Sequence, residues 1–281
     1  HGLAATLCQG VDGHAHALSF RGFRIAELLQ GTSQHEQVSL RKIQCDVQAV
    51  DARFILPLLL KRLEGGADPL ITAAAALLKE WDWEATAECK ACVNYRRWLE
   101  NAVDGPGLAE RALWRGLQQP EDGAPKWAKR DSLTASLKEA LRDLGLVTPE
   151  ALGAWPLRWK DWLVIAFDHV SGVHDFSRTM LAGVGDAQTV SPGVADWEER
   201  FGRTAFWQKA GASHRLSVEM TDPPTVHAMM AGSNRRVGPD AVTQSAADPW
   251  IRWARCQYDR RVFPVDWNAV EDLERLETLQ F

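Results

Sequence analysis

Hydrophobic positions in the first part of the chain recur at helical spacing. From Arg21 to Gln30 the apolar residues cluster on one side of a helix, and Gly31 follows where that helix would end. A second helix is expected to begin near Val38. The next apolar run reaches Leu59 and contains Pro57, which predicts a break or kink at the preceding residue because proline removes a helical hydrogen bond.

The same spacing continues after the break at 65–69, a Gly- and Pro-containing stretch. Helices are predicted at 70–81, at about 85–103 and at 132–144. Thr148 followed by Pro149 is typical of an N-cap with proline in the first helical position.

The pattern of apolar and polar residues changes after Trp155. Residues 162–167 are a short apolar run with β-branched centre positions, and 214–220 alternate between apolar and polar residues as a half-buried strand does. The Asp-Pro-Pro segment that follows cannot continue a ladder, so residues 226–230 are predicted to return as the second strand of a hairpin. A polar helix is expected at 266–279.

These elements give an α+β pattern, with a helical first half and a β-rich second half. We expect one domain over 1–281, made of a mainly helical part at 1–154 and a β-rich part at 155–281 that ends in a helix.

Composition narrows the class of protein. The 281 residues are 46% hydrophobic and 25% charged, with a formal net charge of −5, which argues against a broad electrostatic grip on nucleic acid. The longest apolar runs fall far short of the roughly 20 residues that cross a bilayer, so no membrane span is expected.

Tryptophan occurs 13 times and tyrosine twice, a bias toward large rings that suits an aromatic-lined interior or cleft. The sequence starts at His1 without a basic and apolar leader, so no signal peptide is visible.

The five cysteines do not suggest a disulfide framework, because their number is odd and they are widely spread. Cys89 and Cys92 form a CxxC in a stretch that reads as helix. Without a second pair at metal spacing, buried thiols are favoured over a zinc or redox site.

Several other residues are weak candidates for chemistry. His14 and His16 could grip a metal, but a third ligand is missing, and a solvated loop explains them better. The Asp-His and His-Asp pairs at 168–169 and 174–175 could work as acid and base, although turn hydrogen bonding is the commoner role. The basic loop at 234–236 could bind an anion or simply face solvent. A metal-dependent hydrolase using His14, His16, His169 and His174 is therefore the least favoured hypothesis.

Ordered blocks along the chain carry more information. They are Arg21-Gly-Phe-Arg-Ile-Ala-Glu-Leu-Leu29, Gln44-Cys-Asp46 with Leu56-Pro-Leu-Leu59, Leu157-Arg-Trp-Lys-Asp161, Gly183-Val-Gly-Asp-Ala-Gln-Thr-Val190, Gly211-Ala-Ser-His-Arg215 with Asp222-Pro223, and Asp248-Pro-Trp250 with Trp253, Tyr258 and Phe263. In this order they resemble the penicillin acylase family of N-terminal-nucleophile amidohydrolases. The resemblance covers nearly the whole chain, and it corresponds to the C-terminal half of that family's large subunit.

The resemblance implies a four-layer αββα fold and hydrolysis of an acyl amide. In the family, the first residue of the large subunit is a serine whose hydroxyl attacks the amide, with its own α-amine accepting the proton. An asparagine side chain and a backbone N–H then stabilise the oxyanion. No cofactor or metal is implied for the reaction.

Departures from the family pattern are clear. His1 has no hydroxyl or thiol to serve as nucleophile, and the first asparagine of the chain is Asn94, so the oxyanion asparagine is absent. Arg21 matches the family arginine beside the nucleophile and is the one catalytic position carried over, in a supporting role. Asp12 lies near the place where some relatives have a calcium-ligating carboxylate, but its register is poor and no metal site is assigned.

We therefore expect part of an amidohydrolase that acts on a β-lactam side chain or an acyl-homoserine lactone. A companion polypeptide would carry the nucleophile, and this chain alone would be inactive. The alternative is a non-catalytic scaffold or binding protein that retains the fold, which the changes at His214 and at 234–236 favour weakly. Relatives are exported, so a periplasmic or secreted location is expected by analogy.

Overall fold

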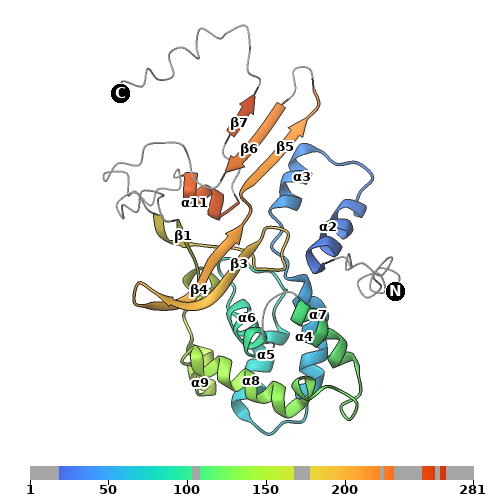
Figure 1. The fold of residues 1–281 in the computed structure, drawn as a ribbon, viewed down its shortest axis with the longest axis vertical. Helices are drawn as coiled ribbons and strands as arrows, with labels where there is room; N and C mark the ends of the chain where they lie inside the picture. The colour runs from blue at the N-terminus through green and yellow to red at the C-terminus, as the bar shows by residue number, and fades with distance from the viewer. Residues whose placement is uncertain are drawn as a thin grey trace.

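A computed structural model describes residues 19–102, 108–167, 178–221, 225–230, 249–256 and 260–263. Within these ranges, helices dominate before Trp155 and strands dominate after it (Figure 1). The α+β class is confirmed. The helix expected at 266–279 lies outside the described residues.

The helices of the first part form a bundle in the lower half of Figure 1, with α2 and α3 above it. Their bounds are α2 Phe20–Gln30, α3 Gln37–Gln44, α4 Val50–Leu63, α5 Pro69–Lys79, α6 Ala91–Ala102, α7 Leu108–Gln118, α8 Arg130–Asp143 and α9 Pro149–Ala154, with a 3₁₀ turn at Lys126–Ala128. The shorter α10 Trp159–Trp162 and α11 Pro249–Ala254 belong to the second part.

Side-chain caps fix the starts of α2, α5 and α9. The Ser19 hydroxyl accepts from the Gly22 N–H, and the Asp68 carboxylate accepts from two N–H groups of α5. Thr148 accepts from the Ala151 N–H at 3.2 Å, which confirms the predicted N-cap of α9. Gly145, with φ +73°, ends α8 as predicted.

A helix break at Pro57, one of the two predicted outcomes there, does not occur, and the predicted start of the helix at residue 85 was wrong. The helix α4 continues through Pro57, whose side chain is exposed, while Ile55, Leu56 and Leu59 are fully buried. Burial of these side chains offsets a proline cost of roughly 3 kcal/mol. The helix expected from residue 85 begins only at Ala91, because Ala85 donates its N–H to the Val47 carbonyl and the preceding residue forms a β-bridge.

Two sheets follow. The first contains β1 Leu163–Phe167, β2 Arg178–Ala182, β3 Gly193–Arg200 and β4 Arg203–Gly211 in the order β2-β1-β4-β3. In it, β1 and β4 are parallel and the other pairs are antiparallel. The second contains β5 His214–Glu219, β6 Thr225–Met230 and β7 Arg260–Phe263, all antiparallel. The predicted strand at 162–167 and the predicted hairpin are both confirmed.

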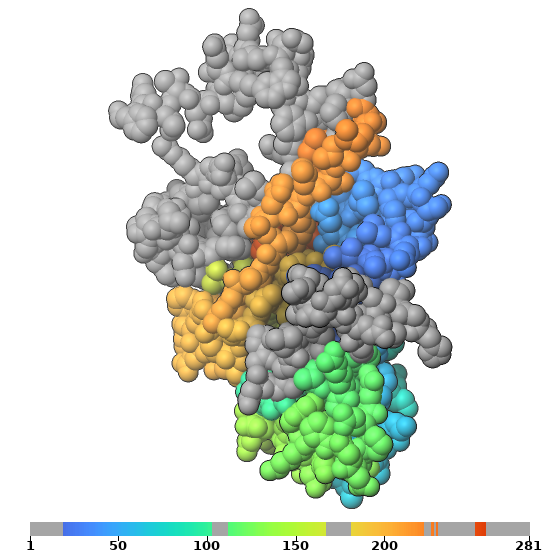
Figure 2. Space-filling model, turned by 45° about the vertical axis from the view of Figure 1, so that its right-hand side comes forward, coloured from blue at the N-terminus to red at the C-terminus, as the bar shows by residue number. Residues whose placement is uncertain are grey.

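The alternation along β5 has an unexpected orientation. Arg215 and Ser217 are buried, whereas Leu216 and Val218 are exposed. The buried guanidinium of Arg215 reaches the Ser191 hydroxyl at 3.1 Å, which explains why the polar face turns inward. The strand lies beside α3 (Figure 2). The Gln37 and Gln44 side chains of α3 donate to the carbonyls of Ser217 and Leu216.

The main hydrophobic core lies between the helices and one face of the first sheet. It joins α4, α5, α6 and α8 to Trp159, Leu163 and Phe206. Trp98, Trp159 and Trp207 are fully buried, in keeping with the aromatic interior expected from composition. No helix in the described part of the chain has the length and hydropathy needed to cross a bilayer.

Two expectations about the cysteines were wrong: that Cys89 and Cys92 are buried free thiols, and that the cysteines do not form disulfides. Cys45 pairs with Cys256, and Cys89 pairs with Cys92. The first bridge joins residues 211 positions apart, a proximity that only the fold creates and that spacing along the sequence does not reveal.

Candidate functional site

A tight turn between β2 and β3 forms the centre of the candidate site. Gly185 has φ +75°, and a Cβ there would lie 2.2 Å from the Ser191 carbonyl oxygen, so only glycine fits. The Thr189 hydroxyl accepts from the Asp186 N–H at 2.9 Å, and Asp186 Oδ1 accepts from the Gln188 N–H at 2.7 Å. The turn therefore closes on itself through its own side chains.

Long-range hydrogen bonds fix this turn to the rest of the protein. The Gly185 N–H donates to the Ala85 carbonyl at 2.8 Å, and the Trp159 indole N–H donates to the Gly185 carbonyl at 2.8 Å. The Ser191 N–H donates to the Asp46 carbonyl at 2.9 Å. The helical part and the first sheet thus meet at this turn.

Arg21 binds the turn from α2. Its Nε donates to the Thr189 carbonyl at 2.9 Å and its Nη2 donates to the Ala187 carbonyl at 2.6 Å. Burial lowers the pKa of Arg21, and the nearby charge of Asp186 opposes that shift. Arginine nevertheless stays protonated at any physiological pH, so the turn carries a fixed positive charge.

A buried ionic cluster lies behind the turn. Arg96 of α6 donates to Asp186 Oδ2 from Nε at 2.9 Å and from Nη2 at 2.6 Å, and to Asp51 Oδ1 at 2.8 Å. The Tyr95 hydroxyl donates to the other Asp51 oxygen at 3.1 Å. Burial raises the pKa of Asp186, Arg96 lowers it, and the neighbouring Asp51 carboxylate raises it. Two carboxylates share one guanidinium, an arrangement that removal of any member would unbalance.

A second ionic group flanks α2. Arg24 makes a bidentate contact with Asp46, through Nε at 3.1 Å and Nη2 at 2.7 Å, and also donates to Glu27. Arg53 donates to both oxygens of Glu27. Hydrogen bonding to Asp46 raises the pKa of Arg24, and hydrogen bonding to Arg53 lowers the pKa of Glu27. These pairs fix the helix that carries Arg21.

Arg215 holds the turn from the side of the second sheet. Besides Ser191, it contacts the Trp253 carbonyl at 3.4 Å and lies over the Trp253 ring, 5.6 Å from its centroid. The turn is therefore bound by Arg21, Arg96 and Arg215, each from a different element.

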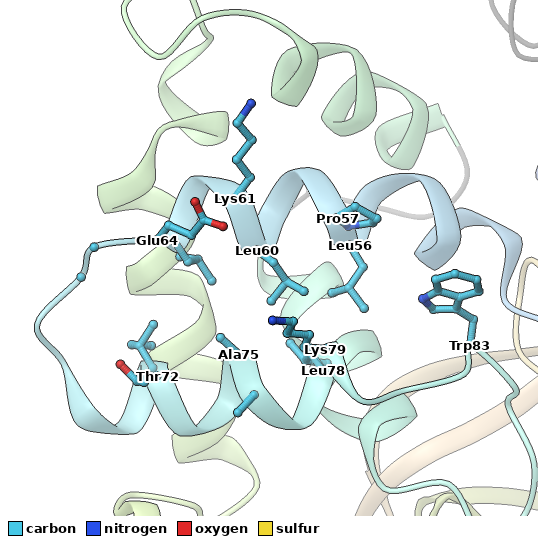
Figure 3. A pocket seen from close by; sticks show the side chains of 15 residues that line it. Leu56, Pro57, Leu60, Lys61, Glu64, Thr72, Ala75, Leu78, Lys79 and Trp83 are labelled. Carbon is cyan, nitrogen blue, oxygen red and sulfur yellow. The ribbon is translucent and has the colours of Figure 1, made fainter. Parts of the chain in front are cut away.

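An apolar groove lies away from this turn, between α4 and α5. It encloses about 550 Å³, and Leu56 and Leu60 of α4 face Ala75 and Leu78 of α5 across it (Figure 3). Arg21 does not line it. The groove is thus separate from the candidate site.

Several residues singled out from the sequence lie outside the described residues, and their roles stay predictions. They are Asp12, His14, His16, the pairs at 168–169 and 174–175, and the loop at 234–236. Among the residues that are described, no group of three or more His, Cys, Asp or Glu side chains could hold a metal ion.

Sequence reasoning missed Arg96 and Asp51. Asp51 lies on the buried face of α4, and Arg96 lies on the buried face of α6. The only sequence signal for a functional role was a charged residue at a position that the helical pattern predicts to be buried. Asp186 was part of a quoted block, but nothing in the sequence indicated which cation it binds.

The site holds the Arg21 guanidinium of α2 against a turn that is itself fixed by hydrogen bonds. A cation positioned in this way can stabilise negative charge. A search among curated proteins finds no match to this chain. A comparison with known families does find one: the penicillin amidase family matches residues 8–272, nearly the full length. This match agrees with the blocks from Arg21 onward, and the chain belongs to the penicillin amidase family, a family of amide hydrolases.

Proposed function

We propose that this chain is the supporting part of an amidohydrolase that cleaves a linear acyl amide through an acyl-enzyme. The substrate class is a β-lactam side chain or an acyl-homoserine lactone, as the resemblance implies. The serine nucleophile and the oxyanion asparagine would lie on a polypeptide segment outside this sequence. The family match over residues 8–272 is the observation that carries the proposal.

Arg21 is the residue of this chain assigned to the reaction. Its two hydrogen bonds to the carbonyls of Ala187 and Thr189 fix the guanidinium relative to the turn. A cation fixed in this way needs little reorganisation when negative charge develops on the substrate carbonyl. Arg21 would act by orienting the substrate and favouring that charge, without forming a covalent bond.

We also propose a periplasmic or secreted location. Disulfides persist in oxidising compartments and are rare in the reducing cytosol. The pairs Cys45–Cys256 and Cys89–Cys92 support an exported protein.

The test combines this chain with the polypeptide encoded upstream of it. It measures hydrolysis of phenylacetyl amides and of acyl-homoserine lactones. We expect activity only from the combination. Arg21→Ala should lower kcat/KM by about 100-fold and Arg21→Lys by about tenfold, in the range seen for lost electrostatic stabilisation. Arg142→Ala, on the exposed face of α8, is the matched control and should leave the rate unchanged.

The scaffold alternative gives a different result. If the upstream sequence encodes neither an N-terminal serine after cleavage nor an oxyanion asparagine, and the combination binds an acyl amide without hydrolysing it, the protein retains the fold without the chemistry. Hydrolysis by this chain alone, unaffected by Arg21→Ala, would contradict the assigned roles.

A further inference from the structure

The Cys89–Cys92 disulfide lies directly before and within the first turn of α6. Cys92 is the second residue of that helix and is fully buried, whereas Cys89 precedes the helix and is half-buried. The Cys92 N–H donates to the Cys89 sulfur at 3.1 Å. The two sulfurs of the bridge therefore differ in their access to solvent.

A surface cavity of about 350 Å³ lies against one of the two cysteines. Its lining includes Cys89 and does not include Cys92. A small thiol in this cavity can therefore approach the Cys89 sulfur, with Cys92 on the protein side as the leaving group. This is the asymmetry that thiol–disulfide exchange needs, since attack occurs at one sulfur and the other departs.

The cavity is acidic. Glu80, Asp82, Glu84 and Glu88 line it together with one cation, Lys90. Lys160 pairs with Glu88 at 2.5 Å and neutralises part of this charge. Burial, together with the charges of Asp46 and Asp82, raises the pKa of Glu84, as expected where negative charges crowd together. An anionic thiol is repelled here and a cationic one is attracted.

We propose that Cys89 and Cys92 form a thiol–disulfide exchange site whose co-reactant is a small cationic aminothiol. The thiolate of one aminothiol attacks Cys89 Sγ, the Cys89–Cys92 bond breaks, and Cys92 leaves as a thiolate. A second aminothiol thiolate attacks the mixed disulfide at the small-molecule sulfur and releases the small-molecule disulfide. The protein disulfide is thereby reduced by two electrons to a dithiol, two aminothiols are oxidised to one disulfide, and their two protons end on the cysteines.

The position of Cys92 favours it as the leaving group. Unpaired N–H groups in the first turn of a helix stabilise a thiolate and lower its pKa. Arg96, which binds Asp51 and Asp186, lies one turn further along α6. The exchange site is separate from amide hydrolysis and does not depend on it.

The first experiment uses the unmodified folded chain. Opening of Cys89–Cys92 is followed by alkylation and peptide mass spectrometry, which separates it from Cys8 and from Cys45–Cys256. Cysteamine, 2-mercaptoethanol and 2-mercaptoethanesulfonate are compared, with each rate divided by the rate of the same thiol on an uncharged model disulfide. At low salt, the normalised rate with cysteamine should exceed that with 2-mercaptoethanesulfonate by about tenfold, and high salt should reduce this ratio.

The second experiment tests which sulfur is attacked. In Cys92→Ser, the Cys89 thiol should form a mixed disulfide with cystamine at least about tenfold faster than the Cys92 thiol does in Cys89→Ser, because the cavity reaches Cys89 and not Cys92. Asp82→Asn in the otherwise unchanged chain should lower the preference for cysteamine. Equal normalised rates for the three thiols, or a bridge that opens only when the protein unfolds, would overturn the proposal. The thiol comparison needs no variant, so it decides the question even if a cysteine variant fails to fold.

Discussion

Arg96 and Asp186, which are 90 residues apart in the sequence, are joined by two hydrogen bonds of 2.9 and 2.6 Å in a buried environment. Arg96 also binds Asp51, so one guanidinium donates to two buried carboxylates. This contact connects helix α6 to the turn that binds Arg21. The candidate site therefore depends on a charge pair that lies behind it.

Removing the cation should be more harmful than removing one carboxylate. Arg96→Ala removes the guanidinium that binds both Asp51 and Asp186 and leaves only the charge of Arg21 acting on Asp186, so it should lower the free energy of unfolding by about 3–5 kcal/mol. Asp186→Asn leaves Arg96 paired with Asp51, and should cost only about 1–3 kcal/mol. Urea denaturation measures both, with Arg142→Ala as the control. A larger loss for Asp186→Asn would contradict the shared-cation arrangement.

Gly185 should not tolerate a side chain. Its φ of +75° and the 2.2 Å approach of a Cβ to the Ser191 carbonyl oxygen mean that Gly185→Ala must deform the turn, at a cost of roughly 2 kcal/mol or more. Gly153→Ala is the matched control, because that glycine is in helix α9 and the position a Cβ would take there is open space. The control should stabilise the protein by about 0.5–1 kcal/mol. Thermal denaturation of both variants tests the contrast, and a harmless Gly185→Ala would show that the turn is not fixed.

The sequence predicted those features of the structure that are determined by residues close together in the chain. The N-cap at Thr148, the end of α8 at Gly145 and the β5–β6 hairpin were all predicted, because turn residues and periodicity act over a few positions. A break or a kink was predicted at Pro57, and α4 does not break there, because packing against distant elements outweighs the local proline preference.

The candidate site was less predictable. Arg21 was identified from the resemblance to a family, and no local pattern distinguished it from other arginines. Arg21 and its carbonyl partners at 187 and 189 are more than 160 residues apart in the sequence, and so are Cys45 and Cys256. Such contacts are set by tertiary structure and leave no mark on sequence spacing.

Stability should also depend on pH through Glu100. Burial raises the pKa of Glu100 to about 7, with Arg97 opposing the shift. Between the ordinary glutamate pKa of about 4.5 and pH 7, the unfolded chain loses this proton while the folded chain retains it. The contribution of Glu100 is therefore fully present at low pH and is lost as the pH rises through 7.

Glu100→Gln tests this dependence, because glutamine does not titrate. The difference in unfolding free energy between the original chain and the variant should shift in favour of the variant as the pH rises from 4.5 to 7. Glu139→Gln, on the exposed face of α8, provides the control for a simple change of net charge. A difference curve that is flat across this range, or that slopes the other way, would show that Glu100 is ionised in the folded protein well below neutral pH.

The two disulfides should contribute unequally to stability. Closing a loop restricts the unfolded chain, and the effect grows with the logarithm of loop length. The Cys45–Cys256 bridge spans 211 positions and the Cys89–Cys92 bridge spans three, so chain entropy gives roughly 5 kcal/mol for the first and roughly 2 kcal/mol for the second. Guanidinium denaturation of the Cys45→Ala/Cys256→Ala and Cys89→Ala/Cys92→Ala double variants should show this order. Equal losses, or a larger loss at the short bridge, would mean that local contacts around the start of α6 outweigh the long-range closure.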